Sequence, residues 1–399
     1  MNADIIIIGG GIIGCATAMR LLQAKPSMKL LVLEKEGSVA QHQSGRNSGV
    51  IHSGLYYKPG SLKATNCRRG YRQLIDFCQR ENIAHEICGK LVIATSAEDV
   101  PRLEELRRRG IANGLRGLRW LKAEEILETE PNCSGVAGLL VPQTGIVDYG
   151  VVARKYSEKI QELGAQVKLG EEVIDIRSQS GKVEVIGRNQ SWMASSAIVC
   201  AGLQADRLAV KTTKDLPVRI IPFRGEYYKL KESARYLVKN LIYPVPDPKF
   251  PFLGVHFTRM IDGGIECGPN AVLAFGREAY RKTDFSLRDT WETLAWPGFR
   301  KMARQYWRMG FGEWHRSVSK RAFVKALQKL VPTIQSGDLE SGRAGIRAQA
   351  CDREGNLLDD FDIRTHGPVI QVCNAPSPAA TASLAIADVL VSRVIECFK

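Results

Sequence analysis

The sequence predicts a mixed α/β (α+β) protein with two units, one built on a parallel sheet and the other on an antiparallel sheet. Three observations lead to this prediction. The chain opens with a short apolar run, Ile5–Ile8, which is followed by a glycine-rich turn and a helix. Its middle, from Leu216 to about Gly268, alternates apolar and polar residues as half-buried strands do. Its end returns to an apolar strand, Val369–Cys373, before a helix of small residues over 379–394.

The opening segment has the order strand, glycine turn, helix, strand and acid that is typical of a Rossmann-like dinucleotide site. Gly9 makes the tight turn, Gly11 lets the backbone approach a pyrophosphate, and Gly14 lets helix and strand pack closely. A second strand ends at Glu34, which can accept a hydrogen bond from the adenosine ribose and whose charge disfavours NADP. The residues expected to contact the dinucleotide here are Gly9, Gly11, Ile13, Gly14, Glu34 and Lys35.

The polar run over 41–54 follows this unit and contains three glycines. Such a run suits a backbone that passes close to a flat ring system, with Ser44, Asn47 and Ser48 as hydrogen-bond donors and Gly49 beside them. A polar surface loop is the alternative interpretation of this run taken alone.

Helices are predicted over 61–82, 98–113, 122–129 and 150–163, and strands over 166–169, 173–178, 182–186 and 195–200. The last strand ends in a second glycine turn, so we expect Val173 and Gly202 to lie beneath a bound dinucleotide. The pattern predicts a discontinuous dinucleotide unit of 1–80, 147–215 and 340–399. The substrate unit would take 81–146 and 216–339, including a basic helical stretch over 296–329.

Composition narrows the class of protein. The 399 residues are 44% hydrophobic and 25% charged, and no apolar run approaches the ~20 residues of a membrane span. The ten cysteines are scattered without C-x-x-C spacing, so we expect reduced thiols and no metal site. Met1 lies almost on the first strand, which predicts no signal peptide and a cytoplasmic protein.

The net charge of +14 is concentrated in one stretch with aromatic residues between the basic ones. Its basic residues are Arg300, Lys301, Arg304, Arg308, Arg316, Lys320, Arg321, Lys325 and Lys329. This mixture favours a surface that binds peripherally to an anionic membrane, on the inner face of the cell membrane. The alternatives are a merely solvated surface with the aromatic side chains packed inside, and a nucleic-acid surface.

Further segments of the chain indicate which protein family it resembles. They span 56–64, 144–149, 222–227, 242–248, 252–256, 268–275, 345–350 and 373–381. Together with the polar run over 41–54, they resemble the L-2-hydroxyglutarate oxidases and dehydrogenases of the D-amino-acid-oxidase-like FAD superfamily. The resemblance covers nearly the whole chain. It implies bound FAD and oxidation of L-2-hydroxyglutarate to 2-oxoglutarate by hydride transfer to flavin N5.

The implied reaction needs a base for the hydroxyl proton and cations for two carboxylates. His52 is the first candidate base, because the resemblance extends to glycerol-phosphate oxidases and places it before the ring, and His256 is the second. Arg224, Arg259 and Arg347 lie among small or aromatic residues and are the expected carboxylate ligands, with Tyr57 and Tyr243 as further donors.

The C-terminal turn, Asn374–Thr381, leads from a strand into a helix. By the same resemblance, Asn374, Pro376 and Ser377 would contact the flavin, and the positive end of the helix would stabilise negative charge on the reduced ring.

Electrons would pass to a membrane quinone or to oxygen. Two other functions remain open: an amine or amino-acid oxidase of the same superfamily, and a basic flavoprotein that binds nucleic acid. The aromatic stripe argues against a nucleic-acid partner.

Overall fold

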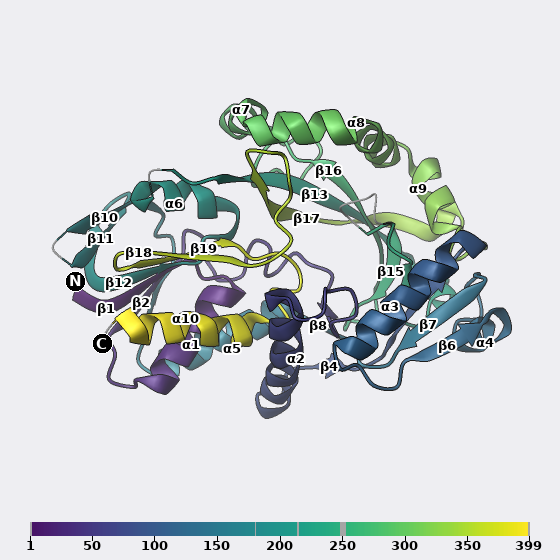
Figure 1. The fold of residues 1–399 in the computed structure, drawn as a ribbon, viewed down its shortest axis with the longest axis horizontal. Coiled ribbons are helices and arrows are strands. Elements are labelled where there is room, and N and C mark those ends of the chain that lie inside the picture. The colour runs from purple at the N-terminus through teal and green to yellow at the C-terminus, as the bar shows by residue number, and fades with distance from the viewer. Residues whose placement is uncertain (1, 180, 214, 248–252, 398–399) are drawn as a thin grey trace.

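The computed structural model describes residues 2–179, 181–213, 215–247 and 253–397, and two large sheets organise them (Figure 1). The first sheet has a parallel centre in the order β9-β2-β1-β12-β19. Its strands are β1 (Asn2–Ile8), β2 (Leu30–Leu33), β9 (Gln166–Lys168), β12 (Ser191–Val199) and β19 (Val369–Asn374). Antiparallel strands extend it: β10 (Val173–Gln179), β11 (Lys182–Gly187) and β18 (Asp362–His366).

The first strand is buried on both faces, as its unbroken apolar run predicts. Ile5 and Ile7 pack against helices on one face, and Ile6 and Ile8 pack in a second core on the other. The helices of the first face are α1 (Ile12–Ala24), α2 (Leu62–Arg80), α5 (Tyr149–Glu162) and α10 (Ser383–Cys397). The other face is covered by the β10-β11 ribbon and α6 (Ala205–Thr212).

The second sheet has the order β17-β13-β16-β15-β14-β5-β7-β6 and is antiparallel except where β14 meets β5. Its strands are β5 (Lys90–Ala94), β6 (Arg119–Lys122), β7 (Ala137–Val141), β13 (Val218–Leu230), β14 (Ile242–Pro244), β15 (His256–Arg259), β16 (Ile265–Leu273) and β17 (Leu339–Asp352). A small sheet of β3 (Val50–Ile51), β8 (Gly145–Val147) and β4 (His85–Glu86) completes the strands.

Helices cover both ends of the second sheet. They are α3 (Val100–Ala112), α4 (Ala123–Thr129), α7 (Leu287–Ala295), α8 (Pro297–Val318) and α9 (Lys320–Leu327). Short 3-10 turns lie at Ala97–Asp99, Gly202–Gln204, Glu232–Leu237 and Ser336–Asp338. Figure 1 shows α7 and α8 along the outer edge of the molecule, above β13, β16 and β17.

The predicted fold class is confirmed, and the predicted elements differ from the observed ones mainly at their ends. The last helix begins at Ser383 rather than at 379, because Pro376 and Pro378 lie in the turn before it. The predicted boundary at 340 was wrong, since β17 pairs with β13 in the second sheet. The other boundaries remain a proposal. Residues 248 and 252, which belong to two of the segments that carry the family resemblance, lie outside the described ranges.

The aromatic side chains of the basic stretch divide into two groups. Trp296, Phe299 and Phe323 are buried, so the prediction that these aromatics face a membrane was wrong for them. By contrast Trp307, Phe311 and Trp314 are more than half exposed along α8. Within the described ranges, no helix is both long and apolar enough to span a bilayer.

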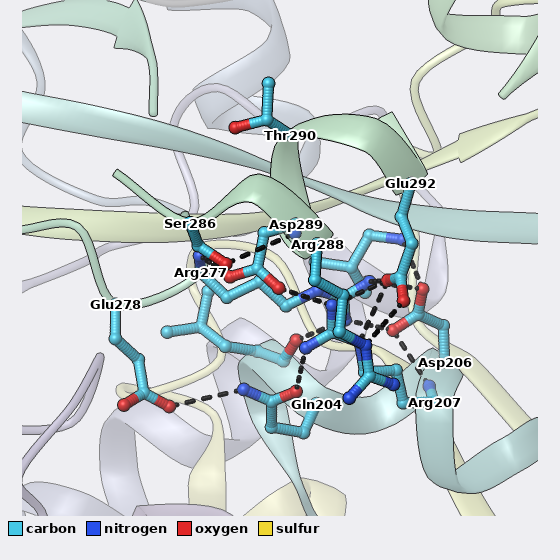
Figure 2. Close-up of polar contacts among 12 residues, drawn as sticks. Gln204, Asp206, Arg207, Arg277, Glu278, Ser286, Arg288, Asp289, Thr290 and Glu292 are labelled. Carbon is cyan, nitrogen blue, oxygen red and sulfur yellow. Dashed lines mark hydrogen bonds and ion pairs between the residues drawn. The ribbon is translucent and has the colours of Figure 1, made fainter. Parts of the chain in front are cut away.

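An ionic clamp, formed by Asp206, Arg207, Arg277, Asp289 and Glu292, joins α6 to α7 (Figure 2). The Arg277 guanidinium donates to both Asp206 oxygens and to the Leu203 carbonyl, and the two ion-paired side chains are only 4% and 1% exposed. Arg207 pairs with Asp289 and Glu292. Each guanidinium of the clamp therefore has a carboxylate partner across the boundary between the two sheets.

Candidate active site

One cavity of about 1860 Å³ runs between the two large sheets and reaches from the first glycine turn to β17. Sites for a single small molecule are typically about 300–1,000 Å³. The cavity is therefore large enough for a dinucleotide together with a substrate. Its two ends are lined by different kinds of residue.

At the first end the glycine turn is crowded against neighbouring backbone. A Cβ atom on Gly9, whose φ is +111°, would lie 2.3 Å from the Cys200 carbonyl oxygen, and one on Gly14 would lie 2.0 Å from the Gly9 oxygen. A Cβ on Gly11 would lie 3.3 Å from Ser44 Oγ, at the cavity wall. The glycines thus keep open a cradle at the start of α1, where backbone N–H groups favour phosphate.

Glu34 ties this cradle together. Its carboxylate accepts from the Gly10 N–H at 2.7 Å and from the Glu36 N–H at 2.9 Å, while it still lines the cavity. Ser44 accepts from the Ile12 N–H at 2.9 Å, so its oxygen holds the first turn of α1. Contact of Glu34 with a ribose hydroxyl remains a prediction.

Most of the cofactor-contacting residues predicted from the sequence line the cavity. These are Gly9, Gly11, Ile13, Glu34, Lys35, Ser44, Asn47, Ser48, Val173, Gly202, Asn374, Pro376 and Ser377. Gly14 and Gly49 lie outside this lining, and their contact with the cofactor stays a prediction, whereas the close helix–strand packing predicted for Gly14 is confirmed. Gly14 packs α1 on β1, and Gly49, with φ +67°, passes so close to β8 that a Cβ would lie 2.8 Å from the Val147 oxygen.

Asn374, which lines the same cavity, offers an acceptor that has no hydrogen-bond partner among the described residues. Its Nδ2 donates to the Leu358 and Asp360 carbonyls, at 3.2 and 2.9 Å, which leaves Oδ1 buried and unsatisfied. A buried acceptor without a donor is costly, and the N–H edge of a flavin ring would satisfy it. The residues present therefore fit FAD.

His52 lies where the two ends of the cavity meet. Its Nε2 is 3.3 Å from Ser377 Oγ, and its backbone N–H donates to Thr381 Oγ1. Burial, and then the positive charges of Lys90 and Lys63, lower the pKa of His52 to about 3. The imidazole is therefore neutral near pH 7 and keeps a lone pair that can accept a proton.

His256 approaches from β15. Its Nδ1 is 2.8 Å from the Gly254 carbonyl, which places the ring hydrogen on Nδ1, and its ring stacks on Tyr243 at 3.9 Å between centroids. Burial, and then the charges of Arg347 and Lys90, lower its pKa to about 3. The structure therefore brings the two predicted bases together, and the charges of Lys90 and Arg347 lower the pKa of both.

Arg347, Tyr57 and Tyr243 also line this end, as predicted. Arg347 hydrogen-bonds to the cavity-lining Tyr227, and Tyr57 hydrogen-bonds to Ser377, which in turn contacts His52. The Tyr243 hydroxyl lies 3.3 Å from Thr258 Oγ1.

Arg224 and Arg259 do not line the cavity, so the prediction that they bind substrate was wrong. The Arg224 guanidinium pairs with Glu226 at 2.8 Å and donates to the carbonyls of Ala279 and Arg281. Arg259 pairs with Glu86 at the surface. Each of the two guanidinium groups therefore already has a carboxylate partner within the protein.

The residues missed from the sequence are Tyr56 and Lys90. Lys90 is 1% exposed, and its Nζ lies over the rings of Tyr56 and Tyr243, at 4.3 and 4.8 Å from their centroids. The Tyr56 hydroxyl is buried and has no hydrogen-bond partner among the described residues. The one available signal was a lysine at the start of the apolar strand 90–94, where a charge is unexpected.

One group of ligand atoms has metal-like spacing, from Glu36, His42 and Glu278. Lys35 Nζ lies 2.5 Å from the Glu36 carboxylate and 2.6 Å from the Glu278 carboxylate, so an ammonium group already bridges them.

Comparison with known proteins gives consistent results. The sequence family described as "FAD dependent oxidoreductase" matches residues 4–393. An L-2-hydroxyglutarate dehydrogenase of Indibacter alkaliphilus is 56% identical over the whole of both chains. The protein of the same name from Escherichia coli K12 is 45% identical, over 98% of this chain and 93% of its own.

Solved structures share the fold. The FAD-bound L-alpha-glycerophosphate oxidase of Mycoplasma pneumoniae has a TM-score of 0.81 and 25% identity, covering 99% of this chain and 95% of its own. Glycine oxidase of Geobacillus kaustophilus has a TM-score of 0.75 over 99% of this chain and 95% of its own, but only 18% identity, so it speaks to the fold alone.

Proposed function

This chain belongs to the FAD dependent oxidoreductase family and, within it, to the L-2-hydroxyglutarate dehydrogenases, and on that premise we propose that it oxidises L-2-hydroxyglutarate to 2-oxoglutarate. It is an enzyme and its cofactor is FAD. The observation that carries the substrate is the substrate-end cluster of His52, Lys90, His256 and Arg347, in which two neutral histidines lie near the buried Lys90 and the half-buried Arg347.

The reaction removes a hydride from C2 and a proton from the C2 hydroxyl. FAD, when bound, supplies the two-electron acceptor for the hydride. Arg347 binds one substrate carboxylate, since a guanidinium matches the planar carboxylate oxygens. The fixed places of the carboxylate and of the base then leave only one face of C2 toward the cofactor, which selects the L-enantiomer.

His52 accepts the hydroxyl proton in this proposal, and His256 is the next candidate. An imidazole with a pKa of about 3 is a weak base. A substrate with two carboxylates offsets the charges of Lys90 and Arg347 and so raises the pKa of His52 toward the working pH. Ser377, which contacts Nε2 of His52, orients the ring.

Anaerobic mixing with a panel of acids tests the proposal. L-2-hydroxyglutarate should bleach the flavin absorbance at about 450 nm, and the D-enantiomer should leave it unchanged. Bleaching by glycine or L-amino acids, with none by 2-hydroxy acids, would instead identify an amine oxidase.

For the electron acceptor we propose a quinone, reached by peripheral binding of α7 and α8 to an anionic membrane. The exposed residues of α8 include Arg300, Arg304, Trp307, Arg308 and Phe311, which recur at the spacing of one helical face. Exposed apolar side chains on α7, Leu287, Trp291 and Leu294, continue it. Basic residues suit anionic headgroups, and exposed tryptophans suit the interface.

Sedimentation with liposomes tests this second proposal. Wild-type protein should sediment with anionic vesicles at low salt and much less with neutral ones. Replacing Arg300, Lys301, Arg304 and Arg308 with Gln should weaken binding without changing flavin reduction by substrate. If the wild type stays in solution with anionic vesicles, oxygen or a soluble acceptor is the better assignment.

A further inference from the structure

Lys90 carries a buried charge that the fold itself does not use. It begins β5, which pairs with β7 on one side and with β14 on the other, so its backbone is fixed within the second sheet. Burial lowers the pKa of Lys90 to about 7, and Cys67 is the group that acts in the opposite direction. Among the described residues, no carboxylate forms an ion pair with Lys90.

Two phenol rings lie between this charge and the cavity. The rings of Tyr56 and Tyr243 cover Nζ, and both residues line the cavity. The aromatic faces stabilise a cation in part, but they do not neutralise it. The positive charge therefore acts on the cavity, and it reaches His52 and His256, whose pKa values it lowers.

Tyr56 adds a donor at the same place. Its hydroxyl is buried without a partner, and its backbone oxygen accepts from Arg109 at 2.9 Å, which fixes the residue. A cation on the face of a phenol makes the hydroxyl a better donor to an anion. An unsatisfied hydroxyl beside an unneutralised cation is what a carboxylate needs.

We propose that Tyr56 and Lys90 form the recognition site for the second, distal carboxylate of the substrate, with the Tyr56 hydroxyl as the contact and Lys90 as a positioning charge behind it. This rests on the proposed function, because it assumes a 2-hydroxy-dicarboxylate. It assigns the two carboxylates to different cations, Arg347 for one and Lys90 for the other. It also explains why burying Lys90 without a partner is tolerated, since the substrate supplies the counter-charge.

The test is the preference of the holoenzyme for L-2-hydroxyglutarate over L-2-hydroxypentanoate, which has the same chain length and lacks the distal carboxylate. The readout is kcat/KM for anaerobic flavin reduction. Lys90→Met should lower this preference by about tenfold or more, mainly through KM, and Tyr56→Phe by about threefold to tenfold. Lys231→Met, which removes an exposed lysine away from the cavity, is the matched control and should leave the preference unchanged.

Comparison with L-2-hydroxypentanoate separates recognition from other effects. A change that acts only through the pKa of His52 alters reduction by both substrates alike and leaves the preference unchanged, whereas loss of the distal carboxylate site lowers it. The proposal is overturned if both variants keep the wild-type preference to within about twofold, or if both substrates lose rate equally. If Lys90→Met gives no yellow protein, Tyr56→Phe decides alone. A wild type that no 2-hydroxy-dicarboxylate reduces would instead contradict the proposed function itself.

Discussion

The ionic clamp and the substrate-end cluster each contain a deeply buried cationic side chain, yet they are built in opposite ways. In the clamp, Arg277 and Asp206 form a pair whose side chains are 4% and 1% exposed (Figure 2). In the substrate-end cluster, Lys90 is equally buried but faces two aromatic rings. A buried cation whose partner is inside the protein stabilises the fold, whereas one that lies behind cavity-lining rings without a carboxylate can act on an anionic ligand in the cavity.

The largest effect should come from the base in the substrate-end cluster. His52→Ala should lower the rate of flavin reduction by L-2-hydroxyglutarate by about 10²–10⁴ while FAD stays bound, because the hydroxyl proton loses its acceptor. Stopped-flow absorbance measures this rate. An unchanged rate would move the base elsewhere, and the same experiment on His256→Ala would follow.

Stability should change in opposite directions in the two regions. Arg277→Met leaves Asp206 buried without its partner and should lower the free energy of unfolding by about 3–5 kcal/mol. Lys90→Met removes an unneutralised buried charge and should raise the stability of the flavoprotein by about 1 kcal/mol. Urea unfolding followed by fluorescence gives both values.

A double variant, Asp206→Asn with Arg277→Met, provides the control for the clamp, since it removes both charges and should recover part of the loss. If both single variants destabilise the protein equally, the contrast between the clamp and Lys90 is wrong.

Arg347→Met should have a smaller effect on catalysis than His52→Ala. Losing one charged hydrogen-bonding partner should lower kcat/KM for L-2-hydroxyglutarate by about tenfold to a hundredfold. Steady-state reduction of an artificial dye measures it. FAD content should not change, and an effect below about twofold would remove Arg347 from the carboxylate site.

The smallest effect is expected at Arg259, which pairs with Glu86 at the surface and lies outside the cavity. Arg259→Met should change kcat/KM by less than about twofold, because its guanidinium lies outside the cavity and already pairs with Glu86. A large rise in KM would mean that this arginine reaches the substrate after all.

These two regions also separate what the sequence could predict from what it could not. The cofactor end depends on residues close together in the chain, such as Gly9, Gly11 and Glu34. One short segment of sequence is therefore enough to predict a dinucleotide site. Ser44 was predicted from the polar run that follows, whereas Asn374 comes from a distant segment and was supplied by the resemblance to a known family.

The substrate end depends on strand pairing over long sequence distances. Arg224 and Glu226 alternate on one strand, so their side chains share a face, and this spacing could have revealed the ion pair. The partner of Arg259 is Glu86, and no local pattern connects them. A role for Lys90 can be inferred only once it is known that β14 pairs with β5 and brings Tyr243 beside the lysine. Local sequence does not give this strand pairing.

The central claim is that the positive charge of the substrate-end cluster receives its counter-charge from a dicarboxylate, and proton uptake on binding tests it most directly. In the free protein a pKa of about 7 leaves Lys90 mostly neutral at about pH 8, and a bound dianion raises that pKa. Calorimetric titration of the flavoprotein with glutarate at about pH 8, in buffers of different ionisation enthalpy, should show uptake of about one proton per site, and none in Lys90→Met. Binding of glutarate with no proton uptake in the wild type, or with the same uptake in Lys90→Met, would contradict the account.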